Sequence, residues 1–152
     1  MAIATSATHV DHQPTRSLER AQAAARVADL NRGRDITIID LRKLTPVFDY
    51  FVVITGSSRR QLHAIAEEID LVLRKEYGDK RLGIEGYTDS RWILLDFGDV
   101  VVHLFDEETR QYYDLEHLWA GAKRIDYVPP ARPVVVQETL SQEALPTDKS
   151  AE

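Results

Sequence analysis

The sequence predicts one α/β domain, with a mixed central sheet of about five strands and helices packed on it. Short β-branched and aromatic runs alternate with segments of helical periodicity, and Gly or Pro residues separate them. A chain of 152 residues has room for one core but not comfortably for two. Its apolar content of 43% is ordinary for a globular protein, so a sizeable core can form.

The first half of this domain is expected to form a helix, two strands and a second helix. Residues 17–31 repeat Leu and Ala at helical spacing, whereas residues 36–41 and 50–55 are apolar runs typical of buried strands. Ser58 and Gln61 have the spacing of a capping box, in which each side chain satisfies an amide of the first helical turn. A helix is therefore predicted to begin after Ser58 and to end at Gly78.

The second half is expected to form three strands and a last helix. A short strand is predicted over residues 82–86, and stronger strands over 92–97 and 100–105. The pair Gly98-Asp99 between the last two favours a tight type II′ hairpin, because Gly accepts the positive φ that this turn requires. Asp106 is a candidate N-cap, and it is followed at helical spacings by Tyr112, Leu115, Leu118 and Trp119.

The two ends of the chain have the composition of tails. Residues 1–15 are polar, which predicts a disordered tail, and residues 129–152 contain four prolines, which predicts a flexible one. The domain is therefore expected over residues 16–128. With no Cys, disulfides and thiolate metal sites are excluded. We find no apolar run of membrane-spanning length and no secretory pattern, and we interpret the protein as cytoplasmic, without a membrane partner.

Charge is distributed unevenly along the chain, whose formal net charge is -6. Residues 16–84 hold 13 basic and 10 acidic side chains, whereas residues 85–116 hold nine acidic side chains and only two basic ones. The net acidity disfavours a binding mode based on neutralising phosphates with Lys and Arg. The acidic stretch is either a solvated face or a surface that matches a basic partner.

Gly56, Ser57 and Ser58 lie between a predicted strand and a predicted helix. Exposed amides at such a position can bind phosphate, and nucleotidyltransferases carry a Gly-Ser turn there, so a nucleotide-binding enzyme is the alternative hypothesis. Enzymes of that kind need a pair of carboxylates for divalent metal. The following strand, residues 82–85, reads LGIE and supplies no such pair. A turn with a helix cap is the favoured interpretation, with no catalytic residue.

His103 and Asp96 lie on opposite arms of the predicted hairpin, with Asp99 in its turn. A facing His and Asp could orient a metal or a general base, but no nucleophile or full ligand set accompanies them. A histidine hydrogen-bonded to a neighbouring carboxylate for structural reasons is the favoured interpretation. The other four histidines are scattered, so no metal and no cofactor are assigned.

Trp92 begins a strand in which it shares one face with Leu94 and Asp96, while Ile93, Leu95 and Phe97 occupy the other. Both faces are largely apolar, so the strand could be buried on both sides. Alternatively, Trp92 could lie at an interface, with its indole N–H reaching a polar partner. The same two interpretations apply to Trp119.

Four segments, taken together, resemble the ribosomal silencing factor family, also called Iojap-like proteins. They are residues 49–58 (DYFVVITGSS), 85–86 (EG), 92–103 (WILLDFGDVVVH) and 110–119 (RQYYDLEHLW). The segments occur in order, and the resemblance covers roughly residues 18–122. It implies a fold related to nucleotidyltransferases that has lost the catalytic acids, and therefore a protein that is not an enzyme.

The resemblance also implies a mode of action. A member of this family would dock on protein fourteen of the large ribosomal subunit, block joining of the small subunit and repress translation when nutrients are scarce. A homodimer in the free state is a further expectation. The docking surface implied for this chain draws on Trp92, Leu95, Asp96 and Asp99, with three further candidates in Glu85, Leu118 and Trp119.

Overall fold

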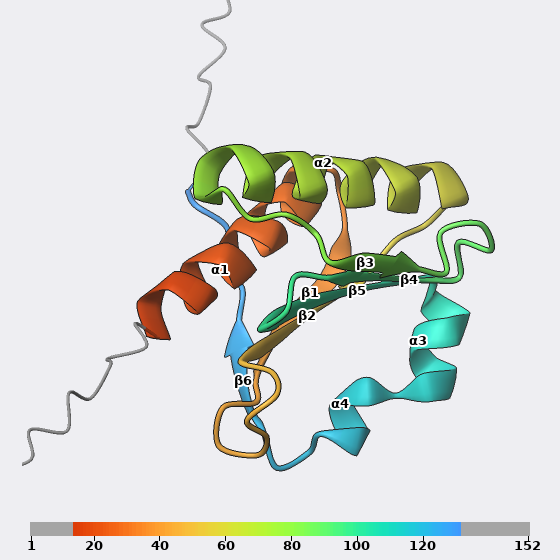
Figure 1. Ribbon diagram of the computed structural model, residues 1–152. Coiled ribbons are helices and arrows are strands. Elements are labelled where there is room, and N and C mark those ends of the chain that lie inside the picture. The colour runs from red at the N-terminus through yellow and green to blue at the C-terminus, as the bar shows by residue number, and fades with distance from the viewer. Residues whose placement is uncertain (1–13, 132–152) are drawn as a thin grey trace, which may run out of the picture.

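A six-stranded mixed sheet forms the centre of the protein in the computed structural model, which describes residues 14–131 (Figure 1). The elements are α1 (Pro14–Leu30), β1 (Arg34–Asp40), β2 (Tyr50–Thr55), α2 (Arg59–Tyr77), β3 (Gly83–Glu85), β4 (Trp92–Asp96), β5 (Val100–Phe105), α3 (Glu107–Tyr113), α4 (Leu115–Leu118) and β6 (Lys123–Asp126). The strand order is β3-β4-β5-β2-β1-β6. The pair β2–β5 is parallel and the other four pairs are antiparallel, so the predicted α/β fold with a mixed sheet is confirmed.

Helix α2 begins and ends at the residues that the sequence indicates. The Ser58 hydroxyl accepts a hydrogen bond from the Gln61 amide at 3.1 Å, and Gly78 ends the helix with a left-handed φ of 64°. The Gln61 side chain accepts from the Ser57 amide at 2.6 Å, one residue earlier than a regular capping box requires. The amides of Ser57 and Gln61, on either side of the helix start, therefore donate within the chain.

The β4–β5 hairpin turns at Gly98 and Asp99. Gly98 has a φ of 88°, and the Phe97 amide donates to the Val100 carbonyl at 3.0 Å across the turn. The Asp96 carboxylate reinforces the turn, because it accepts a hydrogen bond from the Gly98 amide at 2.8 Å. A two-residue hairpin with a glycine at positive φ is therefore present, as predicted.

Three features differ from the sequence expectations. A sixth strand, β6, pairs antiparallel with β1, whereas about five strands were expected; its sequence KRID carries no apolar pattern. The last helix is divided into α3 and α4 at Asp114, which adopts a left-handed φ of 45°. Helix α1 begins at Pro14, slightly before the expected start of the domain at residue 16.

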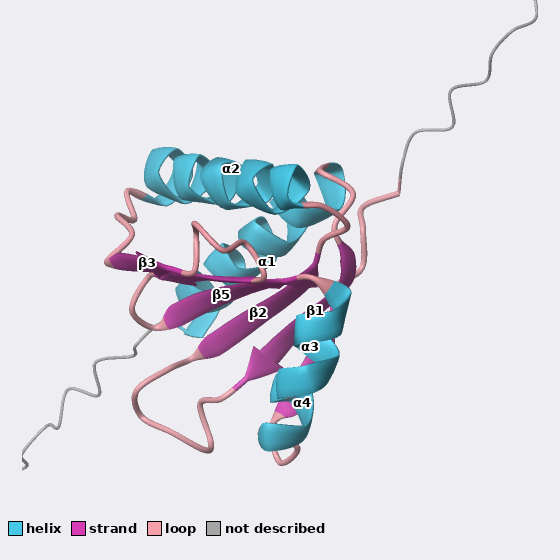
Figure 2. Cartoon of the chain, turned by 90° about the vertical axis from the view of Figure 1, so that its right-hand side faces the viewer, coloured by secondary structure: helices cyan, strands magenta, loops and turns pink. Residues whose placement is uncertain are grey.

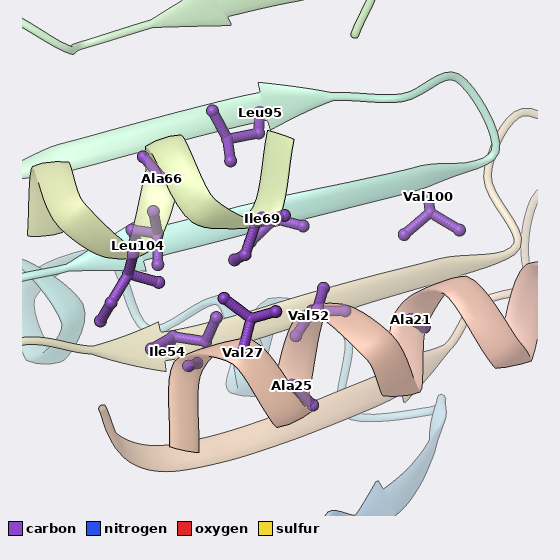
Figure 3. Close-up of a cluster of buried hydrophobic side chains, with 14 of the residues drawn as sticks. Ala21, Ala25, Val27, Val52, Ile54, Ala66, Ile69, Leu95, Val100 and Leu104 are labelled. Carbon is purple, nitrogen blue, oxygen red and sulfur yellow. The ribbon is translucent and has the colours of Figure 1, made fainter. Parts of the chain in front are cut away.

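The main hydrophobic core lies between the sheet and helices α1 and α2. Because side chains alternate along a strand, β2, β4 and β5 each send every second residue toward these helices. Figure 3 shows these side chains packed against alanines of α1 and against Ile69 of α2. Leu95 is part of this core, and its exposed fraction is 0%.

Helices α3 and α4 lie on the side of the sheet opposite α2 (Figure 2). A smaller buried cluster forms there, in which Leu115 packs with residues of β1, β2 and β5. Half-buried Phe48, Trp92, Leu94 and Trp119 border this cluster, so the second face of the sheet is only partly covered. Among the residues that the structure describes, every helix is too short or too polar to cross a membrane.

Candidate functional site

Trp92 opens β4 on the partly covered face of the sheet. Ile93 and Leu95 point toward α1 and α2 and are fully buried, whereas Trp92 and Leu94 point the other way and stay half-buried. Glu85 of β3 and His103 of β5 lie on the same face as Trp92 and Leu94, because both pair with Leu94 in the sheet. Trp92 therefore belongs to a surface that α1 and α2 do not cover.

The Trp92 side chain is held by contacts within the chain. Its indole N–H donates a hydrogen bond to Nδ1 of His103 at 3.1 Å. Its ring stacks on Phe105 with 4.9 Å between centroids and meets Tyr113 of α3 at 4.7 Å. The orientation of the indole is thus fixed before any partner arrives, which lowers the entropy cost of binding.

His103 is a buried residue, and its hydrogen-bond partner differs from the expected one. The sequence interpretation gave it a neighbouring carboxylate, but Asp96 pairs opposite Val101 and the partner of the imidazole is the Trp92 indole. Burial lowers the pKa of His103 from 6.5 to about 4. The imidazole is therefore neutral near pH 7, with Nδ1 as the acceptor and the proton on Nε2.

A continuous set of aromatic rings extends from Trp92 across the sheet to α4. Phe51 contacts the His103 ring at 4.5 Å, the Phe48 ring at 5.2 Å and the Trp119 ring at 6.0 Å between centroids. We call this group of rings the aromatic face. Phe48, Trp92, Tyr113 and Trp119 are partly exposed, whereas Phe51 and His103 are buried beneath them. Aromatic side chains with fixed rings are typical of the centre of a protein interface.

A hollow of about 570 Å³ lies beside Trp92, between the loop that precedes β4 and helix α3. Two tyrosines of α3 line it, and both are exposed: Tyr112 by 81% and Tyr113 by 51%. Asp89 and Glu108 also line this hollow, and so does Arg91. Aromatic rings near carboxylates attract a cation, so this hollow suits a Lys or Arg side chain of a partner.

The other expected docking residues lie in several environments. Glu85 is exposed at the end of β3, and Leu118 of α4 is 72% exposed. Trp119 is half-buried, with its ring edge on Phe51. Asp96 lies on the face of Trp92, but one of its carboxylate oxygens already accepts from Gly98. Glu85, Leu118 and Trp119 therefore border the same side of the sheet as Trp92.

Leu95 and Asp99 do not fit the expectation of a docking role. Leu95 is fully buried beneath the helices, because the alternation of β4 turns it away from Trp92 (Figure 3). The Asp99 carboxylate forms an ion pair with Arg20 of α1 and accepts a hydrogen bond from Ser17 at 3.0 Å. Partial burial opposes ionisation of Asp99, but the hydrogen bond and charge of Arg20 hold its pKa below the usual value. Its observed partners are therefore internal.

The Gly56-Ser57-Ser58 turn has the features of a packed helix cap. The Gly56 amide donates to the Phe105 carbonyl at 2.8 Å, and the Ser57 amide donates to the Gln61 side chain. A Cβ at Gly56 would lie 2.4 Å from the Leu62 side chain, so Gly is required for close packing. Within the described part of the chain, no cluster of His, Asp or Glu has the arrangement of a metal site.

Phe48 and Tyr113 of the aromatic face, and Leu94 beside it, were not among the residues expected to dock. The period-two alternation of residues 92–97 was a sufficient signal for Leu94, since it already separates Leu94 from Leu95. Tyr113 carried a weaker signal, because only the fold brings α3 back against β4. Phe48 lies in the loop before β2 and had no periodic pattern to identify it.

Comparisons with known proteins concern the chain as a whole. The curated ribosomal silencing factor of Chromobacterium violaceum is 43% identical over 102 residues, which are 67% of this chain and 83% of that protein. A mouse protein named mitochondrial assembly of ribosomal large subunit protein 1 is 39% identical over 89 residues, 57% of this chain and 39% of the mouse protein. A crystal structure of a Chromobacterium violaceum protein matches with a TM-score of 0.65 and 38% identity, covering 75% of this chain and 93% of that chain.

The family profile described as ribosomal silencing factor during starvation matches residues 14–151. This match includes all described elements and continues past residue 128, where the domain was expected to end. The relatives carry the name of a regulatory factor rather than that of an enzyme. The chain therefore belongs to the ribosomal silencing factor family.

Proposed function

We propose that this protein represses translation by binding the large ribosomal subunit at ribosomal protein fourteen and sterically blocking the small subunit. It acts in the cytoplasm without catalysing a reaction, and it does so when nutrients are scarce. The observation that carries this proposal is the aromatic face, where contacts with His103, Phe105 and Tyr113 fix the orientation of Trp92. Family membership supports the ribosomal role, and the name of the mouse relative refers to the large ribosomal subunit.

The chemistry of the aromatic face supports a protein partner. Trp92, Leu94 and Trp119 offer half-buried apolar surface, and a second protein can bury what remains exposed. An interface of this kind has an apolar and aromatic centre with a polar rim. Glu85 and the hollow beside Trp92 provide such a rim, since the hollow holds Asp89 and Glu108. The basic side chains of a ribosomal protein are the matching chemistry.

The same surface supports the proposal of a homodimer in the free protein. Tyr112 and Leu118 are 81% and 72% exposed, which is costly for apolar surface when the protein is alone. A symmetric dimer that covers this surface would have to dissociate before docking. Self-association and ribosome binding would then compete, so docking would rise less than proportionally as the total protein concentration rises.

Binding to purified ribosomal subunits is the direct test. The full chain should co-sediment with free large subunits but not with small ones, and it should slow subunit joining measured by light scattering. Trp92→Ala should weaken binding by about 2 kcal/mol or more if Trp92 is an anchor. Leu71→Ala is the matched control, because Leu71 is an exposed apolar residue on α2, on the other side of the sheet.

The outcome that removes the proposal is simple to recognise. Wild-type protein that fails to bind large subunits at micromolar concentration would exclude the docking function. Normal binding by a folded Trp92→Ala variant would exclude Trp92 as an anchor while leaving the function in place. Purified ribosomal protein fourteen, offered alone, then identifies whether the contact is with that protein.

A further inference from the structure

We infer that a corner formed by Arg32, Arg59 and Arg60 is a second contact surface, which binds the phosphate backbone of ribosomal RNA. This inference rests on the proposed function, because docking by the aromatic face brings the protein to an RNA-rich particle. It assigns a role to side chains that are outside the aromatic face.

The fold gathers the three arginines at one corner. Arg59 and Arg60 are the first two residues of α2, and both are exposed. Arg32 belongs to the turn between α1 and β1, and the Gln61 side chain donates to its carbonyl at 2.9 Å and to that of Asn31 at 3.0 Å. Gln61 therefore fixes the backbone of Arg32 beside the start of α2, although Arg32 is 27 positions from Arg59 in the sequence.

None of these arginines has an acidic partner in the part of the chain that the structure describes. One carboxylate, that of Glu67, borders the hollow beside Arg59 and Arg60, and it accepts a hydrogen bond from the Tyr87 hydroxyl at 2.7 Å. Arg20, Arg42 and Arg110, in contrast, form ion pairs within the chain. The corner thus presents positive charge that the protein does not neutralise itself.

The position of Arg59 and Arg60 is unfavourable for the helix alone. The N-terminus of a helix carries a partial positive charge, and acidic side chains are normally preferred there. The first turn of α2 has no acidic residue and two arginines. An external anion would relieve this repulsion. An anion at this corner would be held by the arginine side chains, because the Ser57 and Gln61 amides already donate within the chain.

The shape of the corner favours an extended polyanion over a small anion. Arg59, Arg60, His63 and Glu67 border an open hollow of about 560 Å³ rather than an enclosed pocket, and Arg32 lies outside its lining. The charges of Arg32 and Arg59 are spread over two segments, which suits successive phosphates of a backbone. Arginine is the residue best adapted to phosphate, because its planar fork donates two parallel hydrogen bonds.

The salt dependence of binding is the measurement that tests this inference. We compare wild type, Arg59→Ala/Arg60→Ala and the control Arg74→Ala/Lys75→Ala, which removes two exposed charges from the other end of α2. Binding to purified large subunits is measured from about 50 to 200 mM monovalent salt. The magnitude of the slope of log K against log salt should fall by about 1.4 to 1.8 for the Arg59/Arg60 variant, because each of the two lost phosphate contacts reduces it by about 0.7 to 0.9. The control slope should equal that of wild type.

Two further arms separate this inference from the proposed function. With isolated ribosomal protein fourteen, the Arg59/Arg60 variant should bind as well as wild type; a matching loss there would assign the corner to protein and overturn the inference. With protein-free ribosomal RNA, wild type should bind more tightly than the variant at low salt. That result, together with no binding to intact subunits, would keep the RNA contact and remove the docking function.

The thermal stability of the Arg59/Arg60 variant shows whether a loss of binding results only from unfolding. Because Arg59 and Arg60 repel the helix N-terminus, the double variant should melt at the wild-type temperature or above it. A folded variant with an unchanged salt slope on subunits and unchanged affinity for RNA would overturn the inference.

Discussion

The indole N–H of Trp92 donates to Nδ1 of His103, so the polar end of the most prominent aromatic side chain is satisfied inside its own chain. What Trp92 offers outward is therefore ring surface rather than a hydrogen bond. The same contact requires His103 to keep Nδ1 unprotonated. Half-buried Trp92, at the proposed docking surface, is thus coupled to buried His103 in the sheet.

The charge beside Trp92 should affect docking on large subunits. Glu108→Lys places a cation at the hollow where we expect a basic side chain of the partner, so it should lower affinity mainly through slower association. The loss should shrink as salt rises, because the repulsion is screened. Stopped-flow or biolayer measurements at two salt concentrations give both results. Glu19→Lys on α1 is the control, and an equal loss in that variant would show a general charge effect instead.

Protein stability should depend on pH through His103. Its pKa is about 4 in the folded protein and 6.5 ordinarily, so the unfolded chain binds more protons between these pH values. Stability from the neutral imidazole is therefore complete above about pH 6.5 and is lost as pH falls toward 4. The full change is about 3 kcal/mol, from roughly 1.36 kcal/mol per pKa unit.

Urea unfolding at several pH values measures this contribution. His103→Phe should flatten the slope of unfolding free energy against pH between 4 and 6.5 relative to wild type. His103→Phe will also lower stability at pH 7, because the Trp92 N–H loses its acceptor. An unaltered pH slope in that variant would show that His103 titrates normally.

Local patterns of the sequence were sufficient for most of the fold. The runs at residues 50–55 and 100–105 form β2 and β5 at the expected bounds, because buried strands require apolar side chains on both faces. Ser58, Gly78, Gly98 and Asp106 likewise act as the caps and turns that their chemistry predicts. Caps, turns and apolar runs depend on residues that are close together in the chain, so the sequence alone is enough to predict them.

The features that were missed depend on residues far apart in the chain. Strand β6 exists because the edge of β1 accepts it, and its own four residues carry no apolar pattern. The pairing of Asp99 with Arg20 joins positions 79 residues apart, so the carboxylate that was expected to meet a partner is engaged internally. Which face of β4 is covered depends on where α2 packs, and for this reason the sequence alone did not reveal that the face with Leu95 is the buried one.

Arg110 should be important for stability, since it connects α3 to the sheet and to α4. Its guanidinium pairs with Glu116 and donates to the Thr55 hydroxyl at 2.8 Å and the Asp35 carbonyl at 2.6 Å. Arg110→Met would leave a largely buried Glu116 without its partner and should cost about 2 to 3 kcal/mol. Arg34→Met, which breaks an exposed pair with Glu107, should cost less than about 1 kcal/mol.

A double variant distinguishes a lost charge pair from lost packing at Arg110. Arg110→Met combined with Glu116→Gln should recover part of the stability, because no buried carboxylate is then left unpaired. Denaturant unfolding of the four proteins in the cycle gives the coupling energy. A coupling near zero would mean that Arg110 stabilises the protein through its contacts with β1 and β2 alone.

Leu95 and Trp92 should respond in opposite ways to truncation, although they are three residues apart on one strand. Leu95→Ala removes a fully buried side chain from the core beneath α2 and should cost about 2 to 5 kcal/mol of folding free energy. Its effect on docking should vanish once binding is corrected for the folded fraction. Trp92→Ala should show the reverse pattern, with a smaller loss of stability and a larger loss of docking. Thermal melts together with subunit binding on the same samples separate the two, and a docking defect in folded Leu95→Ala would place Leu95 at the interface after all.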